Sequence, residues 1–443
     1  MGLATAVVLA DLGHKVTGVE IDPERIEKLL KGLSPIYEAH LQELLTRAVE
    51  AGSLRFTDNH PEACKDADVT IIAVGTPTRE TWEIDLSYLE SAVESVANAI
   101  EQRNPALPPP LIAIKSTVPS GTCEYLQTLA KRKTPSPFFM VSNPEFLREG
   151  QAIHDTFYPD RIVIGANEEE AFKIMHQLYL PVITQEFEDS PPRPPRPSNL
   201  KVPIPVVKTS PRSAEMIKYA ANAFLATKIS FINEIANLCE EVGADINDVA
   251  IGIGLDPRIG TQFLKAGIGY GGSCFPKDTK ALHHHAGSRG YTFTLLNAVI
   301  EVNRIQRYRF LAKIRKFLHP LSDKTLGILG LAFKPGTDDI REAPSIDIMR
   351  ELKREGASLK ATDPKAIENA RRVFNGCEYH VDPYETVKGC DAVVLVTEWQ
   401  EFVNLDWAHI AHIMKGRFVF DGRNCLDVDV LKAVNLEVIG VGR

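Results

Sequence analysis

The sequence has few cysteines and no arrangement of them that would hold a fold together. Seven occur in 443 residues, at positions 64, 123, 239, 274, 377, 390 and 425, and none forms a Cys-x-x-Cys pair. An odd number at irregular spacing argues against a disulfide framework and against a zinc ribbon. The pattern is typical of a protein in a reducing cytoplasm, and we expect that location.

Two further absences narrow the class of protein. The longest apolar runs are interrupted and only as long as a strand, and no charged-then-apolar signal segment opens the chain, so we expect no transmembrane helix. Acidic residues outnumber basic residues by 58 to 50, which gives a formal charge of −8. A chain of this charge is a poor general binder of nucleic acid or of an anionic membrane, and we expect neither partner.

What the sequence has is an alternation of short apolar strands with helices. In the first half, strands are predicted at 15–20, 68–74, 111–115 and 161–165, and helices at 2–13, 23–32 and 86–102. In the second half, strands are predicted at 325–330, 358–362, 391–396, 417–420 and 437–441. This alternation is typical of parallel α/β sheets. The predicted fold class is therefore α/β, with two Rossmann-like domains.

Two features separate the halves. Residues 189–206 are rich in proline and predict an exposed extended loop. Ser210-Pro211 supplies a cap and a first-turn proline for a long helix from about 211 to 242, ending at Gly243. A helix of this length suggests a spine between two lobes, and a dimer surface. We predict domains at 1–207, 208–318 and 319–443.

The start of the chain carries part of a dinucleotide-binding pattern. That pattern has a strand, a glycine-rich turn and a helix whose N-terminus faces a pyrophosphate, then a strand that ends in an acid. Gly2 matches the third glycine, and Glu20 would bind a ribose diol, which favours NAD over NADP. The preceding strand and the first two glycines are absent. The other interpretation is an ordinary helix–strand unit followed by a charged loop.

Polar residues also follow two further strands. Val74-Gly75-Thr76-Pro77-Thr78 ends one strand and Ser116-Thr117 ends another, and strand ends are where ligands bind in open α/β sheets. Turn chemistry explains both equally well. Glu145 and Glu149 lie four residues apart beside a loop, and either would be a general base if partly buried. Surface helix acids are the alternative.

The long helix carries Lys218 and Asn222 on one face, because they lie four residues apart. An amine and an amide beside apolar neighbours would hold a developing oxyanion. The alternative is a lysine that extends along the edge of the core.

The most informative stretch is 265–282, KAGIGYGGSCFPKDTKAL. Its four glycines predict backbone N–H groups close to a ligand. Cys274 follows directly and, beside Lys277, is a candidate thiolate nucleophile. The histidines at 283–285 are adjacent on a helix and point in different directions, so we expect a solvated helix face and no metal.

The last lobe adds basic groups after its strands. Lys334 and Arg341 lie in AFKPGTDDIRE and are candidates to hold a diphosphate, and Arg423 in the DGR motif offers a further guanidinium. An anionic ligand would need such local positive charges, because the chain as a whole is negatively charged.

Together these stretches resemble the UDP-glucose 6-dehydrogenase family. GLATAVVLADLGHKVTGVEID, NPEFLREG, the helix with Lys218 and Asn222, GYGGSCFPKD, AFKPGTDDIRE and DGR occur in the family's order over nearly the whole chain. The resemblance implies oxidation of the primary alcohol of a nucleotide sugar, UDP-glucose, to a carboxylate by a dimer or higher homo-oligomer, with two NAD reduced. Cys274 would carry the carbon as a thiohemiacetal and then as a thioester.

The resemblance also implies roles for particular residues. Catalytic residues would be Cys274, Lys218, Glu145, Asn222, Asp278 and Thr117, with Glu145 as acid or base in thioester hydrolysis and Asp278 holding a water. NAD would be contacted by Gly2, Glu20, Arg25, Val74, Gly75, Thr76, Pro77, Thr78, Ser116, Glu149, Lys277 and Arg341. The nucleotide sugar would be contacted by Glu145, Phe146, Leu147, Lys218, Asn222, Arg258 (from a neighbouring subunit), Lys265, Ile268, Gly269, Tyr270, Gly271, Phe333, Lys334 and Arg423.

Two departures from the family pattern leave alternatives open. The family begins with a strand and GxGxxG, and without that strand we expect weaker folding and weak or no NAD-dependent activity. The proline-rich stretch reads as an insertion without a catalytic role. The alternatives are a dehydrogenase of GDP-mannose or of a UDP-N-acetylhexosamine, and a protein that binds the nucleotide sugar but has lost NAD.

Overall fold

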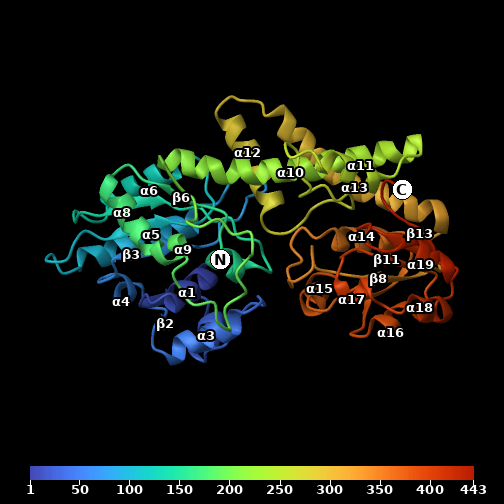
Figure 1. Ribbon diagram of the computed structural model, residues 1–443, viewed down its shortest axis with the longest axis horizontal. Coiled ribbons are helices and arrows are strands. Elements are labelled where there is room, and N and C mark those ends of the chain that lie inside the picture. Colours follow the sequence, from blue (N-terminus) through green and yellow to red (C-terminus); the bar gives the residue numbers. More distant parts are fainter. The chain divides into compact units, whose positions relative to one another are not determined.

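The computed structural model describes residues 1–443, which divide into two compact units, Met1–Ala221 and Asn222–Arg443 (Figure 1). Helix α10 (Pro211–Val242) begins in the first unit and ends in the second. The Ser210 hydroxyl accepts the N–H of Ser213 at 3.3 Å, so the predicted cap is formed, and Gly243 follows the helix with a φ of 74°. The prediction of this helix is confirmed.

The first unit consists of short strands with helices between them. Its strands are β1 (Val16–Val19), β2 (Leu54–Thr57), β3 (Val69–Ile72), β4 (Leu111–Ile114), β5 (Phe139–Ser142), β6 (Ile162–Gly165) and β7 (Val206–Thr209). Its helices before α10 are α1 (Gly2–Asp11), α2 (Pro23–Leu30), α3 (Leu41–Glu50), α4 (His60–Cys64), α5 (Ser87–Glu101), α6 (Thr122–Lys131), α7 (Ala152–Phe157), α8 (Glu169–Leu178) and α9 (Leu180–Thr184).

The strands of the first unit form two sheets. One has five strands in the order β3-β4-β5-β6-β7, and the other is the parallel pair β1-β2. Strands β1 and β3 therefore each keep one unpaired edge. All four residues of β1 and three of the four in β3 are half-buried, whereas β4 is buried throughout. Parallel strands are ordinarily buried on both faces, so the first unit's strands are divided into two sheets between β1 and β3.

The second unit holds one parallel sheet of six strands in the order β10-β9-β8-β11-β12-β13. These strands are β8 (Thr325–Leu329), β9 (Ser358–Thr362), β10 (Glu378–Tyr379), β11 (Ala392–Leu395), β12 (Phe418–Asp421) and β13 (Glu437–Ile439). The helices are α11 (Ile246–Gly254), α12 (Phe275–Ser288), α13 (Thr294–Leu318), α14 (Pro344–Arg354), α15 (Ile367–Val373), α16 (Pro383–Val387), α17 (Gln400–Val403), α18 (Trp407–Ile413) and α19 (Val428–Ala433). Figure 1 shows α14 and α16 on opposite sides of the strands, so the sheet is covered on both faces.

The α/β fold class is confirmed, and every strand and helix that we predicted is present with ends within two residues. The unit boundary falls inside α10, and the three-domain division remains a prediction.

The prediction of an extended proline-rich loop is confirmed for residues 189–205, which form no helix or strand, but two details differ from it. Strand β7 already begins at Val206, and the loop before it is anchored to α1. The Arg193 guanidinium forms an ion pair with Asp11 at 2.6 Å and is only 13% exposed. The Tyr158 hydroxyl donates to the carbonyl of Pro194, which is itself buried, at 2.9 Å. Arginine and buried polar partners hold this segment against the unit, although its prolines exclude regular structure.

Candidate active site

The N-terminus of α1 lies close to the end of strand β3. A Cβ built on Gly2 would stand 3.3 Å from the Cβ of Ala73, which is a tight contact. The third glycine of a dinucleotide-binding turn has this function, because it lets the helix pack against the sheet. The structure therefore supports the match of Gly2 to that glycine.

Glu20 follows β1 directly, at the strand end where the pattern places the ribose-binding acid. Its carboxylate accepts the N–H groups of Ile21 and Asp22 at 2.9 and 3.0 Å. Asp22 in turn caps α2 by accepting the N–H groups of Glu24 and Arg25. Arg25 is exposed on that first turn. The acid is thus oriented by its own loop and remains half-exposed, as a ligand-binding carboxylate requires.

The loops after β3 and β4 are joined by hydroxyl hydrogen bonds. The Ser116 hydroxyl donates to the carbonyl of Val74 at 2.7 Å, and the Thr76 hydroxyl donates to the carbonyl of Thr117 at 3.0 Å. The side chains of Thr76, Ser116 and Thr117 are buried. The structure therefore brings together two stretches predicted for NAD. A Cβ on Gly75 would meet nothing within 4 Å, so this part of the edge is open.

Glu145 and Lys218 form a buried ion pair within the first unit. The Lys218 ammonium lies 3.3 Å from a carboxylate oxygen of Glu145, and each side chain is 4% exposed. The other carboxylate oxygen accepts the Leu147 N–H. Taking two charges out of water costs several kcal/mol for each ion, so such a pair is weak evidence for stability and favours a functional reason. Sequence reasoning singled out both residues but did not pair them.

The Phe146 ring lies close to two cations. The Arg161 guanidinium stands 3.7 Å from the centre of its ring, and the Lys218 ammonium stands 5.4 Å from it. Burial lowers the pKa of Arg161. We did not predict Arg161, because a single arginine at the start of a strand carries no motif. Glu149, predicted to lie near the cofactor, is half-buried in the segment between β5 and α7.

In the second unit, Cys274 precedes α12 as its N-cap residue and is partly exposed. The positive end of a helix favours a thiolate at this position. Its Sγ lies 3.6 Å from the Ser273 hydroxyl. Burial raises the pKa of the thiols of five other cysteines, Cys64, Cys123, Cys377, Cys390 and Cys425, to about 11 for Cys390 and about 12 for Cys377.

Asp278 lies one turn along α12 from Cys274 and is 2% exposed. The Asn222 amide donates to one of its oxygens at 2.6 Å, and the Lys277 ammonium lies 2.6 Å from the other. This buried carboxylate therefore fixes Asn222, on α10, against the helix that begins at Cys274. Lys277 was predicted to contact NAD, and in this structure its ammonium holds Asp278.

The glycine-rich loop before Cys274 is held by side-chain amides. Asn233 of α10 accepts the Gly267 N–H at 2.8 Å, Asn303 of α13 accepts the Tyr270 N–H at 2.8 Å, and Gln306 donates to the Gly267 carbonyl at 2.9 Å. A Cβ on Gly269 would stand 2.5 Å from Asn303, and one on Gly271 would stand 2.4 Å from a backbone oxygen.

The prediction that these glycines point N–H groups at a ligand is contradicted for two of the four. The N–H groups of Gly267 and Gly272 donate within the protein, whereas for Gly269 and Gly271 the prediction remains a prediction. At Gly269 and Gly271 a side chain would also collide with the loop's neighbours, so close packing is a further reason for glycine there.

Arg423 joins three loops at the ends of the second unit's strands. Its guanidinium donates to the carbonyls of Val396, Gly269 and Phe333 at 2.7, 3.0 and 3.1 Å. It is therefore a brace between the glycine-rich loop and the predicted nucleotide-sugar loop at Phe333-Lys334. Lys334 is half-buried in that loop, and Lys265 and Ile268 lie in the glycine-rich loop.

The remaining predicted basic residues are exposed. Arg341 forms a bidentate pair with Asp339 and its side chain is 67% exposed. Arg258 forms a similar pair with Asp256 and is 87% exposed, so it is accessible to another molecule. No group of His, Cys, Asp and Glu side chains suited to a metal ion is present, and no helix is long and apolar enough to cross a membrane.

The fold and these residues define a class of protein: a dehydrogenase with one α/β unit that carries a dinucleotide-binding edge and another that carries a partly exposed cysteine at a helix N-terminus. The UDP-glucose/GDP-mannose dehydrogenase family matches through its NAD-binding domain at residues 1–183, its central domain at 212–305 and its UDP-binding domain at 327–428. The chain belongs to this family, and NAD is its cofactor.

Individual relatives match this chain over its whole length. UDP-glucose 6-dehydrogenase YwqF of Bacillus subtilis is 43% identical over 100% of this chain and 96% of its own. UDP-glucose 6-dehydrogenase of Rickettsia prowazekii is 40% identical over 100% of this chain and 97% of its own. Among solved structures, UDP-glucose dehydrogenase from Pyrobaculum islandicum is 38% identical and superposes with a TM-score of 0.86 over 96% of this chain and 92% of that one.

Proposed function

We propose that the protein oxidises UDP-glucose to UDP-glucuronate in two successive two-electron steps, through a thiohemiacetal and a thioester on Cys274. Relatives named as UDP-glucose 6-dehydrogenases support the substrate. The observation that carries the mechanism is the arrangement around Cys274, which follows a tightly packed loop at the start of α12, one turn from the buried Asp278–Asn222 pair.

The residues of the dinucleotide edge fit NAD. Gly2 allows close packing of α1, Glu20 is a half-exposed carboxylate at the end of β1, and the loops at 74–78 and 116–117 are joined beside an open Gly75. When bound, NAD supplies the hydride acceptor for each of the two oxidations.

In the first step the C6 hydroxyl of the sugar loses a hydride and a proton. We assign the proton to a water held by Asp278, and the developing alkoxide to the Lys218 ammonium and the Asn222 amide. The Cys274 thiolate then bonds to the aldehyde carbon. This addition yields a thiohemiacetal whose oxygen the same donors stabilise.

In the second step the thiohemiacetal loses a second hydride and its hydroxyl proton and becomes a thioester. Glu145 takes a proton from water, with Thr117 positioning that water, and the resulting hydroxide attacks the thioester carbonyl. The carbon–sulfur bond breaks, and the thiolate leaves. The sum is one alcohol, two NAD and one water converted to one carboxylate, two NADH and three protons.

The test is the stoichiometry of NADH. We expect two NADH for each UDP-glucose consumed, and no second NADH from Cys274→Ser. Cys425→Ser is the matched control, since this cysteine is partly exposed but stands at no helix N-terminus that we assign to the site. Uronate formation by Cys274→Ser at the native rate, or one NADH for each sugar, would refute the mechanism.

Substrate choice and loss of NAD are separate questions. A solved relative named as a UDP-D-ManNAc dehydrogenase, from Pyrococcus horikoshii, is 26% identical with a TM-score of 0.83 over 100% of this chain and 97% of its own. A panel of UDP-glucose, GDP-mannose and UDP-N-acetylhexosamines should show turnover with UDP-glucose alone. Calorimetry with NAD and UDP-glucose separately should show heat for both, whereas a protein that has lost NAD would respond only to the sugar.

The proposed homo-oligomer is supported by an apolar stripe on α10. Phe224, Phe231 and Leu238 recur every seven residues, and they are 66%, 52% and 57% exposed. Val242 continues the stripe at 68%. Apolar side chains at this spacing form a seam on one helix face, and such a seam is typical of helix–helix association.

A further inference from the structure

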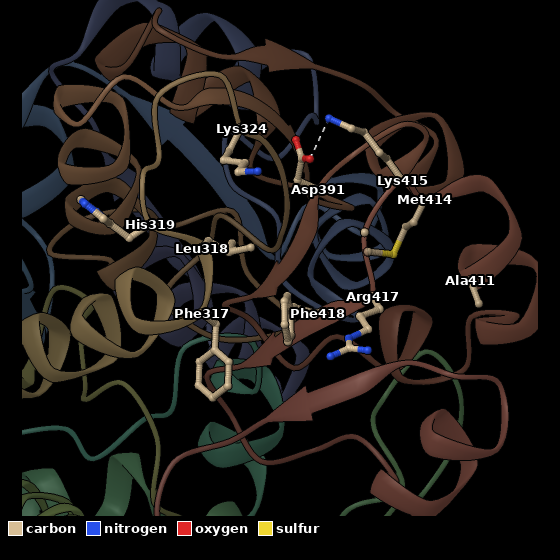
Figure 2. Close-up of a pocket in the computed structure, with 11 residues that line it drawn as sticks. Phe317, Leu318, His319, Lys324, Asp391, Ala411, Met414, Lys415, Arg417 and Phe418 are labelled. Carbon is tan, nitrogen blue, oxygen red and sulfur yellow. Dashed lines mark ion pairs between the residues drawn. The ribbon is translucent and has the colours of Figure 1, made fainter.

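A cavity of about 490 Å³ lies in the second unit, on the side of the sheet where its strands begin (Figure 2). Lys324 directly precedes β8, Asp391 precedes β11 and Arg417 precedes β12, and all three line the cavity. In parallel α/β sheets, cofactors and substrates bind at the opposite edge, where strands end. The cavity is therefore distinct from the loops at Phe333 and Arg423, and the proposed function leaves it without a role.

The lining is rich in cations. Lys324, Lys415 and Arg417 contribute three positive charges, against Asp391 within the cavity and Glu437, which lies 3.3 Å from Arg417 at its rim. Lys415 pairs with Asp391 at 2.9 Å, whereas no carboxylate lies within ion-pair distance of Lys324. The Lys415 and Arg417 side chains are 65% and 68% exposed. In a chain with a formal charge of −8, this local excess of positive charge favours an anionic ligand.

The cavity also has an aromatic wall. The rings of Phe317 and Phe418 have their centres 5.5 Å apart at an interplanar angle of 54°, and Phe317 is 36% exposed. Figure 2 shows Phe418 between Phe317 and Arg417, so the aromatic surface adjoins a guanidinium. A flat ring can stack on such a wall while a charged group of the same ligand reaches the cations.

The basic loop is fixed in place before any ligand binds. The N–H groups of Lys415 and Gly416 donate to the carbonyl of Cys390 at 3.0 and 3.1 Å. A Cβ on Gly416 would stand only 1.8 Å from the backbone oxygen of Asp391, so no other residue fits there without displacing the loop. A preformed cavity of a few hundred Å³ is typical of a small-molecule site.

We propose that this cavity binds a nucleoside polyphosphate, with Lys324, Lys415 and Arg417 on the phosphates and the base against Phe317. Arginine and lysine are the residues that recognise phosphate oxygens. The Asp391 carboxylate keeps its second partner, the Thr325 N–H at 2.9 Å, when Lys415 turns to the ligand. The oligophosphate is the shared chemistry of a nucleotide and of inorganic polyphosphate, and the base distinguishes them.

The test is calorimetric titration of the full-length protein, saturated with NAD and UDP, with ATP and separately with inorganic tripolyphosphate. Saturation fills the dinucleotide and uridine nucleotide sites, so the heat that remains reports a further site. We expect ATP to bind, and a Lys324→Gln, Arg417→Gln variant to weaken ATP at least about tenfold, the effect of 1.4 kcal/mol. Lys432→Gln, an exposed lysine on α19, is the matched control and should leave ATP binding unchanged.

The role of the base is tested by Phe317→Ala, which should weaken ATP but leave tripolyphosphate unaffected. Lys415→Gln provides a second variant at an exposed position if the double variant fails to fold. No ATP heat in the saturated native protein, or equal ATP affinity in the native and Gln variants, would overturn the proposal. Equal affinity for tripolyphosphate and ATP, with no effect of Phe317→Ala, would overturn its nucleoside part.

Discussion

Glu215, on the second turn of α10, is a buried carboxylate whose charge state should control the stability of the first unit. It is 2% exposed, and its two oxygens accept the Gly121 and Cys123 N–H groups at 2.6 and 2.7 Å. These donors belong to the start of α6, a few residues after the Ser116-Thr117 loop. Burial raises the pKa of Glu215 to about 7, against the lowering effect of the two backbone hydrogen bonds.

The magnitude follows from the difference between the folded and unfolded pKa values. An acid with a folded pKa near 7 and an unfolded pKa of 4.5 binds its proton more tightly in the folded state. Its contribution to stability is therefore complete below pH 4.5 and is lost as the pH rises through 7. At 1.36 kcal/mol for each pKa unit, the free energy of unfolding should fall by about 3 kcal/mol across this window.

The assay compares the native protein with Glu215→Gln by urea unfolding at pH 5 and pH 8. Other carboxylates titrate in both proteins, so the quantity of interest is the difference between the two pH dependences. Glutamine cannot ionise and, because its NH₂ group would face one backbone donor, should cost about 1–3 kcal/mol at pH 5. The variant should then lack most of the native decline toward pH 8. An equal decline in both proteins would show that Glu215 is already ionised at pH 5.

Three further predictions test the sheet, the oligomer and the glycine-rich loop. A strand and a glycine-rich turn added ahead of Met1 should pair with the open edges of β1 and β3 and raise both Tm and the rate of NADH formation, and equal activity of the two proteins would refute this reasoning. Phe231→Asp with Leu238→Asp should lower the mass measured by light scattering, whereas Val381→Asp, at a position 89% exposed, should not. Gly269→Ala should lower the free energy of unfolding by about 1–3 kcal/mol through backbone strain, because φ is 92° at this position. The new Cβ would also collide with Asn303, which should lower the stability further. Gly260→Ala, with nothing within 4 Å, should cost less in the same urea assay.

The elements that could be predicted are those whose sequence carries a strong local signal. Helix α10 has a cap, a proline, a long periodic pattern and a terminal glycine, and strands such as β4 are continuous apolar runs. Strands β2, β5, β7 and β10 were missed. Strands β2, β7 and β10 are short and partly polar, so that only pairing with a neighbour defines them, and β5 is a mostly apolar run of only four residues. The anchoring of the proline-rich segment by Arg193 was missed for a related reason: its partner Asp11 lies 182 residues away in sequence.

In the candidate site, too, local sequence signals could be predicted and long-range contacts could not. Motifs indicated Cys274, Glu145 and Lys218, since each lies in a recognisable stretch. The interactions that give these residues their properties are long-range: Glu145 meets Lys218 across 73 residues, and Asn222 meets Asp278 across 56. Spacing along one helix or loop cannot reveal such partners. Arg423 illustrates the limit, because its motif indicated a substrate contact, which remains a prediction, but not its three donations to backbone carbonyls.

The buried polar groups of the two units are best explained by chemistry and not by stability. A core gains little from an ion pair such as Glu145–Lys218, because apolar side chains of equal size would fill the space without the cost of dehydrating two charges. The same argument applies to the Asp278 carboxylate, which is 2% exposed and needs both Asn222 and Lys277 to satisfy it. Within each unit, polar groups kept from water interact more strongly with a developing charge than they would at a surface, since the local dielectric is lower. The reaction that we propose, with an alkoxide, a thiohemiacetal and a thioester in turn, would require this property.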